Sequence, residues 1–165
     1  MTQRVDLATV MDRLAIDAVI TGYAVAVDDG EWADYRALFT PDGRADYRGA
    51  GGVEGPAHEV AEWLARTMRL FPVRQHLVVN RRIGFQDLDG YPGDRAEVLA
   101  DYVNPMRLEN VTADSGDAEV RATAPNFVSG GRYAFSLSRT DSGWRIRTVT
   151  VHEKWRGPAG PSTAG

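Results

Sequence analysis

Apolar residues recur at helical spacing through the first part of the chain. Between residues 7 and 27 they stand three or four positions apart: Leu7, Val10, Met11, Leu14, Ile16, Val19, Ile20, Tyr23, Ala24 and Val27. This spacing predicts a helix that begins after an Asp6 N-cap and ends at the Asp-Asp-Gly segment of residues 28–30.

Two shorter helices are predicted to follow. Residues 31–39 carry their aromatic and leucine side chains on one face, and residues 57–70 form the third helix, which starts after a proline. Between these helices, the Pro-Asp-Gly sequence at 41–43 predicts a turn, residues 43–48 a short strand and residues 49–55 a glycine-rich loop.

Alternation of apolar and polar residues replaces helical spacing in the second half. Strand-like segments cover residues 76–85, 95–109, 119–124, 132–140 and 144–153, with turn sequences between them. Three helices followed by four or five antiparallel strands predict an α+β domain, with the helices packed on one face of the sheet. We expect a single domain over residues 1–157 and a disordered tail over residues 158–165.

Composition removes several classes of function. A net charge of −4 and a pI near 5.4 offer no electrostatic footprint for nucleic acid. The chain has no cysteine, which excludes disulfides, thiolate metal sites and a cysteine nucleophile. Its first residues are charged, unlike a signal peptide, and no apolar run approaches the roughly 20 residues of a membrane span. We therefore expect a cytoplasmic protein without nucleic-acid or membrane partners.

Metal and cofactor motifs are also missing from the sequence. The three histidines, His58, His76 and His152, lie far apart without the spacing of paired metal ligands. The GAGGVEG segment is one residue out of register with a dinucleotide fingerprint and follows a polar strand. No G-x-S-x-G elbow or phosphate-cradling loop is present. We expect neither a metal ion nor an organic cofactor.

Two segments carry the candidate chemistry. The first helix ends with Tyr23 and Asp28, and a strand starts near His76. If the fold brings Asp28 against His76 inside an apolar cavity, the imidazole becomes a general base that is oriented by a carboxylate. Taken alone, a single histidine is more often a surface or structural residue, and an acid near a glycine usually marks a helix end. Both interpretations stay open at this point.

The strands offer possible cavity walls. Tyr133, Phe135 and Arg139 share a face, so an arginine would stand at the polar end of an apolar surface and could hold an anionic or carbonyl group. The alternative is that Arg139 extends into water at the strand end. Another strand carries a set of residues on one face that suits a cavity wall: Ala96, Val98, Ala100, Tyr102, Asn104 and Met106. Tyr47 is either a core tyrosine or a hydroxyl that faces the cavity.

With these residues in view, the chain resembles the SnoaL-like branch of the NTF2-like superfamily, the group that contains scytalone dehydratase, bile-acid 7α-dehydratase and hexachlorocyclohexane dehydrochlorinase. The resemblance covers residues 5–157. It is carried by Y-x4-D followed by G-E-W, by RADYRG, by Q-H-L-V-V-N and by the closing D-S-G-W…E-K-W-R-G.

The resemblance implies a cone-shaped α+β barrel in which a curved, mostly antiparallel sheet wraps around the helices. It implies that Asp28 and His76 form a catalytic dyad and that Tyr23 lies where related dehydratases have tyrosine. Tyr47 matches a pocket tyrosine of scytalone dehydratase, and Arg139 a pocket arginine of the dehydrochlorinase. Leu108 and Tyr133 stand in place of that dehydratase's second histidine and asparagine, so the scytalone reaction itself is not implied.

Three functions are compatible with these residues. The leading hypothesis is a cofactor-independent dehydratase, or a related lyase or isomerase, acting on an apolar cyclic molecule such as a polyketide or steroid. A polyketide cyclase would use the same acid–base pair to form a carbon–carbon bond. A non-catalytic ligand carrier or assembly subunit, like the small subunit of ring-hydroxylating dioxygenases, would need neither a dyad nor an open pocket. Relatives of this kind assemble through the sheet, which implies a homodimer or homotrimer.

Overall fold

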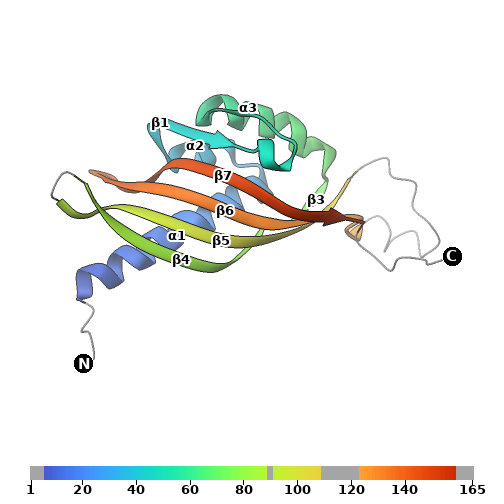
Figure 1. Ribbon diagram of the computed structural model, residues 1–165. Coiled ribbons are helices and arrows are strands. Elements are labelled where there is room, and N and C mark those ends of the chain that lie inside the picture. The colour runs from blue at the N-terminus through green and yellow to red at the C-terminus, as the bar shows by residue number, and fades with distance from the viewer. Residues whose placement is uncertain (1–5, 89–90, 109–122, 159–165) are drawn as a thin grey trace.

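Three helices pack against one side of a seven-stranded sheet (Figure 1). The computed structural model describes residues 6–88, 91–108 and 123–158. The helices are α1 (Leu7–Asp29), α2 (Trp32–Ala37) and α3 (Ala57–Thr67), with short 3-10 helices η1 (Arg48–Ala50) and η2 (Met68–Leu70). The strands are β1 (Phe39–Asp46), β2 (Glu54–Pro56), β3 (Val73–Arg74), β4 (Leu77–Leu88), β5 (Tyr91–Arg107), β6 (Phe127–Thr140) and β7 (Gly143–Gly157).

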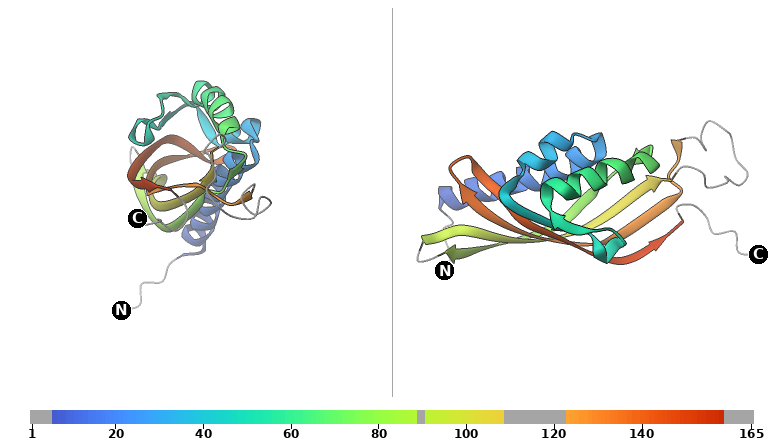
Figure 2. Two further views of the ribbon diagram at one scale, coloured as in Figure 1. Left: turned by 90° about the vertical axis from the view of Figure 1, so that its right-hand side faces the viewer. Right: turned by 90° about the horizontal axis from the view of Figure 1, so that it is seen from above.

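The sheet is mixed but mostly antiparallel. Its strand order is β2-β1-β7-β6-β5-β3, and β4 also pairs with β5. The described pairings are antiparallel except for the parallel pair of β1 and β7. The sheet curves, and the helices lie on one side of it (Figure 2). The predicted α+β class is confirmed, although the sheet stays open and does not close into a barrel.

Helix α1 has the two end signals that its sequence predicts. The Asp6 side chain accepts a hydrogen bond from the backbone N–H of Thr9 at 2.7 Å, which satisfies one free donor of the first turn. At the other end, Gly30 adopts a left-handed conformation with φ of 73°, and its N–H donates to the carbonyl of Ala26. This stop leaves Asp28 in the last turn of the helix.

The core lies between α1, α3 and the inner face of the sheet. Ile16, Ile20 and Tyr23 of α1 are fully or almost fully buried, as are Val98 of β5 and Phe135 of β6. Their burial removes a large apolar area from water and holds α1 across the strands. No helix in the described part of the chain is long and apolar enough to cross a membrane.

Three expectations about local structure need correction or cannot be compared. The turn predicted at residues 41–43 lies inside β1, where the pairing with β7 shifts register between Phe39 and Arg44. The extra residues are absorbed as an irregularity of the strand, so the chain does not reverse. The predicted strand at 119–124 lies mostly outside the described residues, as does the predicted tail after residue 158.

Candidate active site

A cavity of about 210 Å³ lies between the inner face of the sheet, α3 and the C-terminal end of α1. Most of its lining is apolar or aromatic and includes Val27, Trp63, Leu64, Met68 and Phe127. A smaller set of polar side chains enters the same space, among them His76, Tyr47, Asn104 and Glu153. An apolar enclosure with a few convergent polar groups is the usual form of a small-molecule site.

Asp28 and His76 are in direct contact at one side of this cavity. The Nδ1 atom of His76 lies 2.6 Å from Oδ1 of Asp28, and the backbone N–H of His76 donates to Oδ2 of the same carboxylate at 2.8 Å. The side chains of His76 and Asp28 retain 8% and 20% of their exposure, so the pair is largely shielded from water. Because the carboxylate accepts from Nδ1–H, Nε2 is the atom available to accept a proton, and it has no hydrogen-bond partner within the described residues.

Arg74 connects the segments that carry Asp28 and His76. Its Nε donates to the carbonyl of Val27 at 3.0 Å, and its Nη1 donates to the carbonyls of Met68 and Phe71 at 2.9 and 3.2 Å. One guanidinium therefore connects the end of α1, the residues after α3 and strand β3. These bonds satisfy carbonyls that a helix end leaves free, and they fix the end of α1 from a position only two residues before His76.

Three tyrosine hydroxyls meet on the helix side of the cavity. The hydroxyl oxygens of Tyr23 and Tyr47 are 2.5 Å apart, and those of Tyr35 and Tyr47 are 3.0 Å apart. Burial disfavours the phenolate and raises the pKa of each of the three above its ordinary value. These phenols are therefore neutral at physiological pH, and they act as hydrogen-bond donors and acceptors without carrying charge.

A second polar group lies on the sheet wall. Asn104 on β5 is 5% exposed, and its Nδ2 donates to the hydroxyl of Tyr133 over 3.4 Å. Ser129 on β6 donates to Glu153 on β7 at 2.8 Å, and Nε of Arg156 donates to the other oxygen of that carboxylate. The carboxylate of Glu153 is thus paired on both sides, which makes its partial burial tolerable.

Most of the predicted site residues lie in the cavity lining. The structure places these residues there: Tyr23, Tyr47, His76, Tyr102, Asn104, Met106 and Tyr133. Asp28 lies directly behind His76. Phe135 is different: it is fully buried and packs edge-on against the ring of Tyr23, with centroids 5.2 Å apart. Its face of β6 is the predicted one, but Phe135 belongs to the core and not to the cavity wall.

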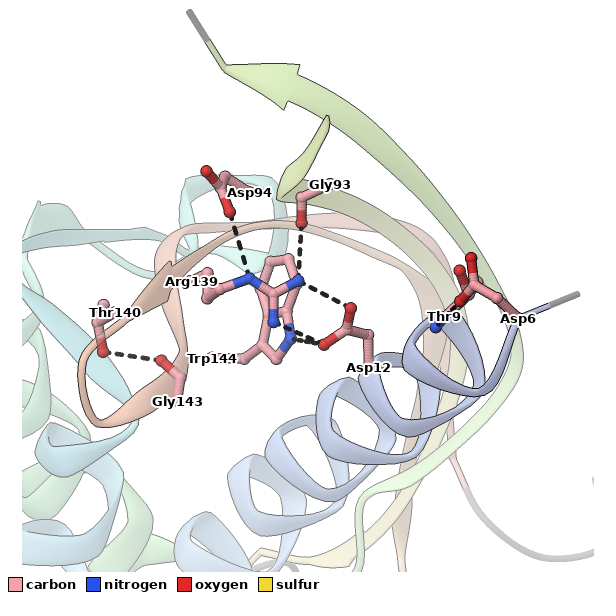
Figure 3. Close-up of polar contacts among 9 residues, drawn as sticks. All are labelled: Asp6, Thr9, Asp12, Gly93, Asp94, Arg139, Thr140, Gly143 and Trp144. Atoms are coloured by element: carbon pink, nitrogen blue, oxygen red, sulfur yellow. Dashed lines mark hydrogen bonds and ion pairs between the residues drawn. The ribbon is translucent and has the colours of Figure 1, made fainter. Parts of the chain in front are cut away.

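Arg139 lies away from the cavity, contrary to our expectation. Its guanidinium donates to both oxygens of Asp12 at 2.8 Å and to Asp94 at 3.2 Å. It also stacks on the ring of Trp144 (Figure 3). The six residue steps along β6 from Tyr133 to Arg139 span about 20 Å. The alternation along β6 was interpreted correctly, but face alone does not tell how far along the strand a cavity extends. Arg139 therefore joins α1 to the far end of the sheet.

Several lining residues were missed by the sequence analysis. Glu153, Ser129, Trp63 and Arg156 all border the cavity. Simple alternation from the buried Val151 would have placed Glu153 on the inner face, so that signal was available. Arg156 could not be found in this way, because a register shift in the pairing of β6 with β7 reverses the alternation between residues 153 and 156.

The described residues contain no group of three or more His, Cys, Asp or Glu side chains arranged to hold a metal ion. The polar groups of the cavity include one imidazole, neutral hydroxyls, an amide and a carboxylate that is already paired. This set is suited to moving protons and holding oxygen atoms of a ligand.

Structural comparison shows the same fold in several solved proteins. A hexachlorocyclohexane dehydrochlorinase from Novosphingobium barchaimii superposes with a TM-score of 0.73 at 17% identity, covering 95% of this chain and 97% of that one. A protein described as a candidate scytalone dehydratase from Novosphingobium aromaticivorans superposes with a TM-score of 0.70 at 16% identity, covering 93% and 91%. At such identities the likeness establishes the fold.

Sequence comparison identifies the family. Uncharacterised proteins of Mycobacterium tuberculosis and Mycobacterium bovis are 30% identical to the chain over 140 residues, which is 85% of this chain and 84% of theirs. The family model of the SnoaL-like domain matches residues 8–150, which include both members of the Asp28–His76 pair. The resemblance to SnoaL-like proteins noted in the sequence is confirmed, and the chain belongs to the SnoaL-like domain family.

Proposed function

We propose that the protein is a cofactor-independent lyase or isomerase, most simply a dehydratase, that acts on an apolar cyclic molecule. The observation that carries this proposal is the 2.6 Å contact between Asp28 and His76 at the edge of an apolar cavity. A buried imidazole that is oriented by a carboxylate and has its second nitrogen unpaired is the usual form of a general base.

The proposed reaction begins with proton abstraction. Nε2 of His76 removes a proton from a carbon next to a carbonyl, and the negative charge moves to the carbonyl oxygen. Asp28 stabilises the imidazolium that forms. A hydroxyl of the Tyr23–Tyr47 pair donates a hydrogen bond to the oxyanion, which it can do because both phenols are protonated.

In a dehydration, the departing hydroxyl group takes the proton back from His76. The C–H and C–O bonds break, a C=C bond forms, and one water molecule leaves. In an isomerisation, the same proton returns to a different carbon. Both reactions need one base and one oxyanion donor, and the aromatic and aliphatic lining suits a ring system as the substrate.

Exchange of carbon-bound protons tests the base directly and needs no knowledge of the natural substrate. We expect the protein to accelerate the exchange of the acidic protons of 2-tetralone in D2O, followed by NMR. His76→Ala and Asp28→Asn are expected to lower the exchange rate by roughly 10²–10⁴-fold, the usual contribution of a positioned acid–base group. His152→Ala, which changes an exposed histidine, is the matched control and is expected to retain the rate.

Equal exchange rates for the wild-type and His76→Ala proteins would refute the proposed base. Circular dichroism of each variant shows whether a loss of rate reflects unfolding. A carrier protein predicts a different pattern, in which 2-tetralone binds and its exchange is not accelerated. The 2.6 Å dyad contact supports the catalytic hypothesis over the carrier, since ligand storage requires no oriented base.

A polyketide cyclase is the second candidate, because the same pair of residues can generate a carbanion that attacks a carbonyl carbon. Mass analysis of products separates the two reactions, since dehydration lowers the mass by one water and an aldol cyclisation alone leaves the mass unchanged. The apolar cavity and the neutral hydroxyl donors support either reaction equally.

A further inference from the structure

Four polar residues form a row across the cavity face of the sheet. Strand β5 pairs first with β3, where Arg74 is opposite Met106, and then with β4, where Leu77 is opposite Val103. The two pairings have the same register, so His76, which lies between β3 and β4, is opposite Asn104. On the other side, Asn104 pairs with Ser129, and Ser129 pairs with Arg156. Side chains directly opposite each other on adjacent strands have Cβ atoms about 5 Å apart. Asn104 is therefore the sheet neighbour of the proposed base.

Asn104 has an acceptor without a partner. Oδ1 of Asn104 is buried and makes no hydrogen bond within the described residues. Three buried side-chain atoms of the described chain share this condition, on Thr40, Arg95 and Asn104, but of these residues only Asn104 lines the cavity. A buried carbonyl oxygen without a donor destabilises the protein, so its retention calls for an explanation.

None of the donors around Asn104 bonds to its Oδ1. Its own Nδ2 is directed to the hydroxyl of Tyr133. The hydroxyl of Ser129 donates to Glu153, and Nε of Arg156 donates to the same carboxylate. The Ser129 and Arg156 donors thus have partners inside the wall, and Asn104 itself is a lining residue of the cavity.

We propose that Asn104 determines substrate specificity by accepting a hydrogen bond from a hydroxyl group of the ligand. A hydroxyl fits better than an ammonium group, because a neutral amide oxygen in an apolar cavity does not compensate for the burial of a cation. Since Asn104 is the sheet neighbour of His76, that hydroxyl lies close to the carbon from which the base removes a proton. The substrate class is thus narrowed to hydroxylated apolar ring compounds.

This inference rests on the cavity being the substrate site of the proposed lyase, but its test is equilibrium binding and needs no turnover. The probes are 2-naphthol and 2-methylnaphthalene, which differ by a hydroxyl in place of a methyl group. Binding is followed by the fluorescence of the tryptophans, one of which, Trp63, lines the cavity. We expect the wild-type protein to prefer 2-naphthol by about tenfold, the size of one hydrogen bond in a buried site.

Asn104→Leu removes the acceptor and keeps the side-chain size. We expect the preference for 2-naphthol to fall by about tenfold in this variant, because the apolar probe no longer leaves an acceptor unpaired. His152→Ala, which changes an exposed residue outside the cavity lining, is expected to retain the preference. A third probe, 2-methoxynaphthalene, can only accept hydrogen bonds, so its affinity relative to 2-methylnaphthalene is expected to be the same in the wild-type protein and in Asn104→Leu.

Stability of the ligand-free protein gives an independent test. Asn126 is the matched control, because its Oδ1 accepts from the N–H of Leu108 at 2.7 Å and its Nδ2 donates to the carbonyl of Leu108 at 3.0 Å. Asn126→Leu breaks both bonds and is expected to lower the melting temperature. Asn104→Leu removes an unpaired acceptor and one long hydrogen bond, so its melting temperature is expected to equal or exceed that of the wild-type protein.

Two results would overturn the assignment. The first is an unchanged preference for 2-naphthol in Asn104→Leu, and the second is a preference for 2-methoxynaphthalene over 2-methylnaphthalene that is lost in Asn104→Leu, which would make Asn104 a donor. Failure of the proposed catalysis would appear in proton exchange and not in probe binding. The Asp28→Asn protein is expected to keep the preference for 2-naphthol, whether or not it catalyses exchange. Loss of the Asn104 effect with proton exchange retained would reject this inference and leave the proposed reaction standing.

Discussion

Tyr47 is the residue at which the hydroxyl groups of the cavity converge. Its oxygen lies within hydrogen-bond distance of both Tyr23 and Tyr35, and all three side chains are buried. Each of the outer tyrosines shares its hydrogen bond with Tyr47. The hydroxyl of Tyr47 therefore contributes more to the stability of the cluster than that of Tyr23 or Tyr35, although all three side chains carry the same chemical group.

Tyr47→Phe is expected to lower the free energy of unfolding by about 1–3 kcal/mol, because two buried hydroxyls lose their common partner. The measurement is urea denaturation at neutral pH. Tyr35→Phe removes only one of the two bonds and serves as the comparison, with a smaller expected loss. A Tyr47→Phe protein as stable as the wild type would show that the hydroxyl cluster adds nothing to stability.

The sequence predicts the residue types of the site and the strand faces that carry them, but not which side chains pair. The order Tyr23, Asp28 and His76 along the chain suggested a base and its carboxylate, and the structure brings Asp28 and His76 together. The hydroxyl contacts of Tyr47 could not be foreseen, because they join a helix residue to one that follows a strand through three-dimensional packing alone. The unpaired oxygen of Asn104 was hidden for the same reason.

The end of α1 is the element that places the carboxylate of the dyad. Gly30 ends the helix with a φ of 73°, a conformation that costs a residue with a side chain about 1–2 kcal/mol. A Cβ added at Gly30 would also lie 3.1 Å from Nη2 of Arg74. The guanidinium that connects α1 to β3 therefore depends on the absence of a side chain at this glycine.

Gly30→Ala is expected to lower the free energy of unfolding by about 1–2 kcal/mol and to reduce proton exchange by His76, because the helix end and Arg74 shift together. Thermal unfolding and the 2-tetralone assay measure the two effects. Gly157→Ala is the control, since no atom lies within 4 Å of the position that a Cβ would take there, and its φ is ordinary. Equal losses in the two variants would argue against a specific role for the helix stop.

Helices and strands with strong local signals were predicted well, and those decided by pairing were not. The long amphipathic pattern and the glycine stop identified α1 almost to the residue. The Pro-Asp-Gly sequence at 41–43 has the composition of a turn, but the parallel pairing of β1 with β7 keeps it in a strand. Such pairing joins segments that lie far apart along the chain, and no local pattern records it.

Two polar clusters among the described residues lie at opposite ends of the sheet. One is the cavity with the Asp28–His76 pair, and the other is the ion cluster around Arg139 that ties the first turns of α1 to β5, β6 and β7. The hydrogen bonds and charge of Arg139 hold the pKa of Asp12 below its ordinary value. Because of this lowered pKa, the ion cluster around Arg139 stabilises the folded protein by an amount that decreases in acid.

Because the pKa of Asp12 is lower in the folded than in the unfolded protein, its contribution is complete above pH 3.8 and disappears as the pH falls through the folded-state pKa. Asp12→Asn is therefore expected to lower the melting temperature at neutral pH and to lose less further stability on acidification than the wild type. Calorimetry from neutral pH down to about pH 3 measures both trends.

Arg139→Gln removes the partner of Asp12 and is expected to flatten the same pH dependence. If Asp12→Asn and the wild-type protein lost stability in parallel on acidification, the ion cluster would not be the cause.

The homodimer or homotrimer suggested by the family resemblance stays a prediction, because the contacts within one chain do not determine its assembly.

The carboxylate of Asp28 has two tasks, since one oxygen binds the main chain at residue 76 and the other binds the imidazole. Engineering of the cavity for a new substrate thus cannot vary Asp28 without disturbing the main chain at His76. Trp63, Met68 and Phe127 line the same space and are not part of either bond. Mutant libraries confined to those three positions would change which ligands the cavity accepts and leave the geometry of the Asp28–His76 pair unchanged.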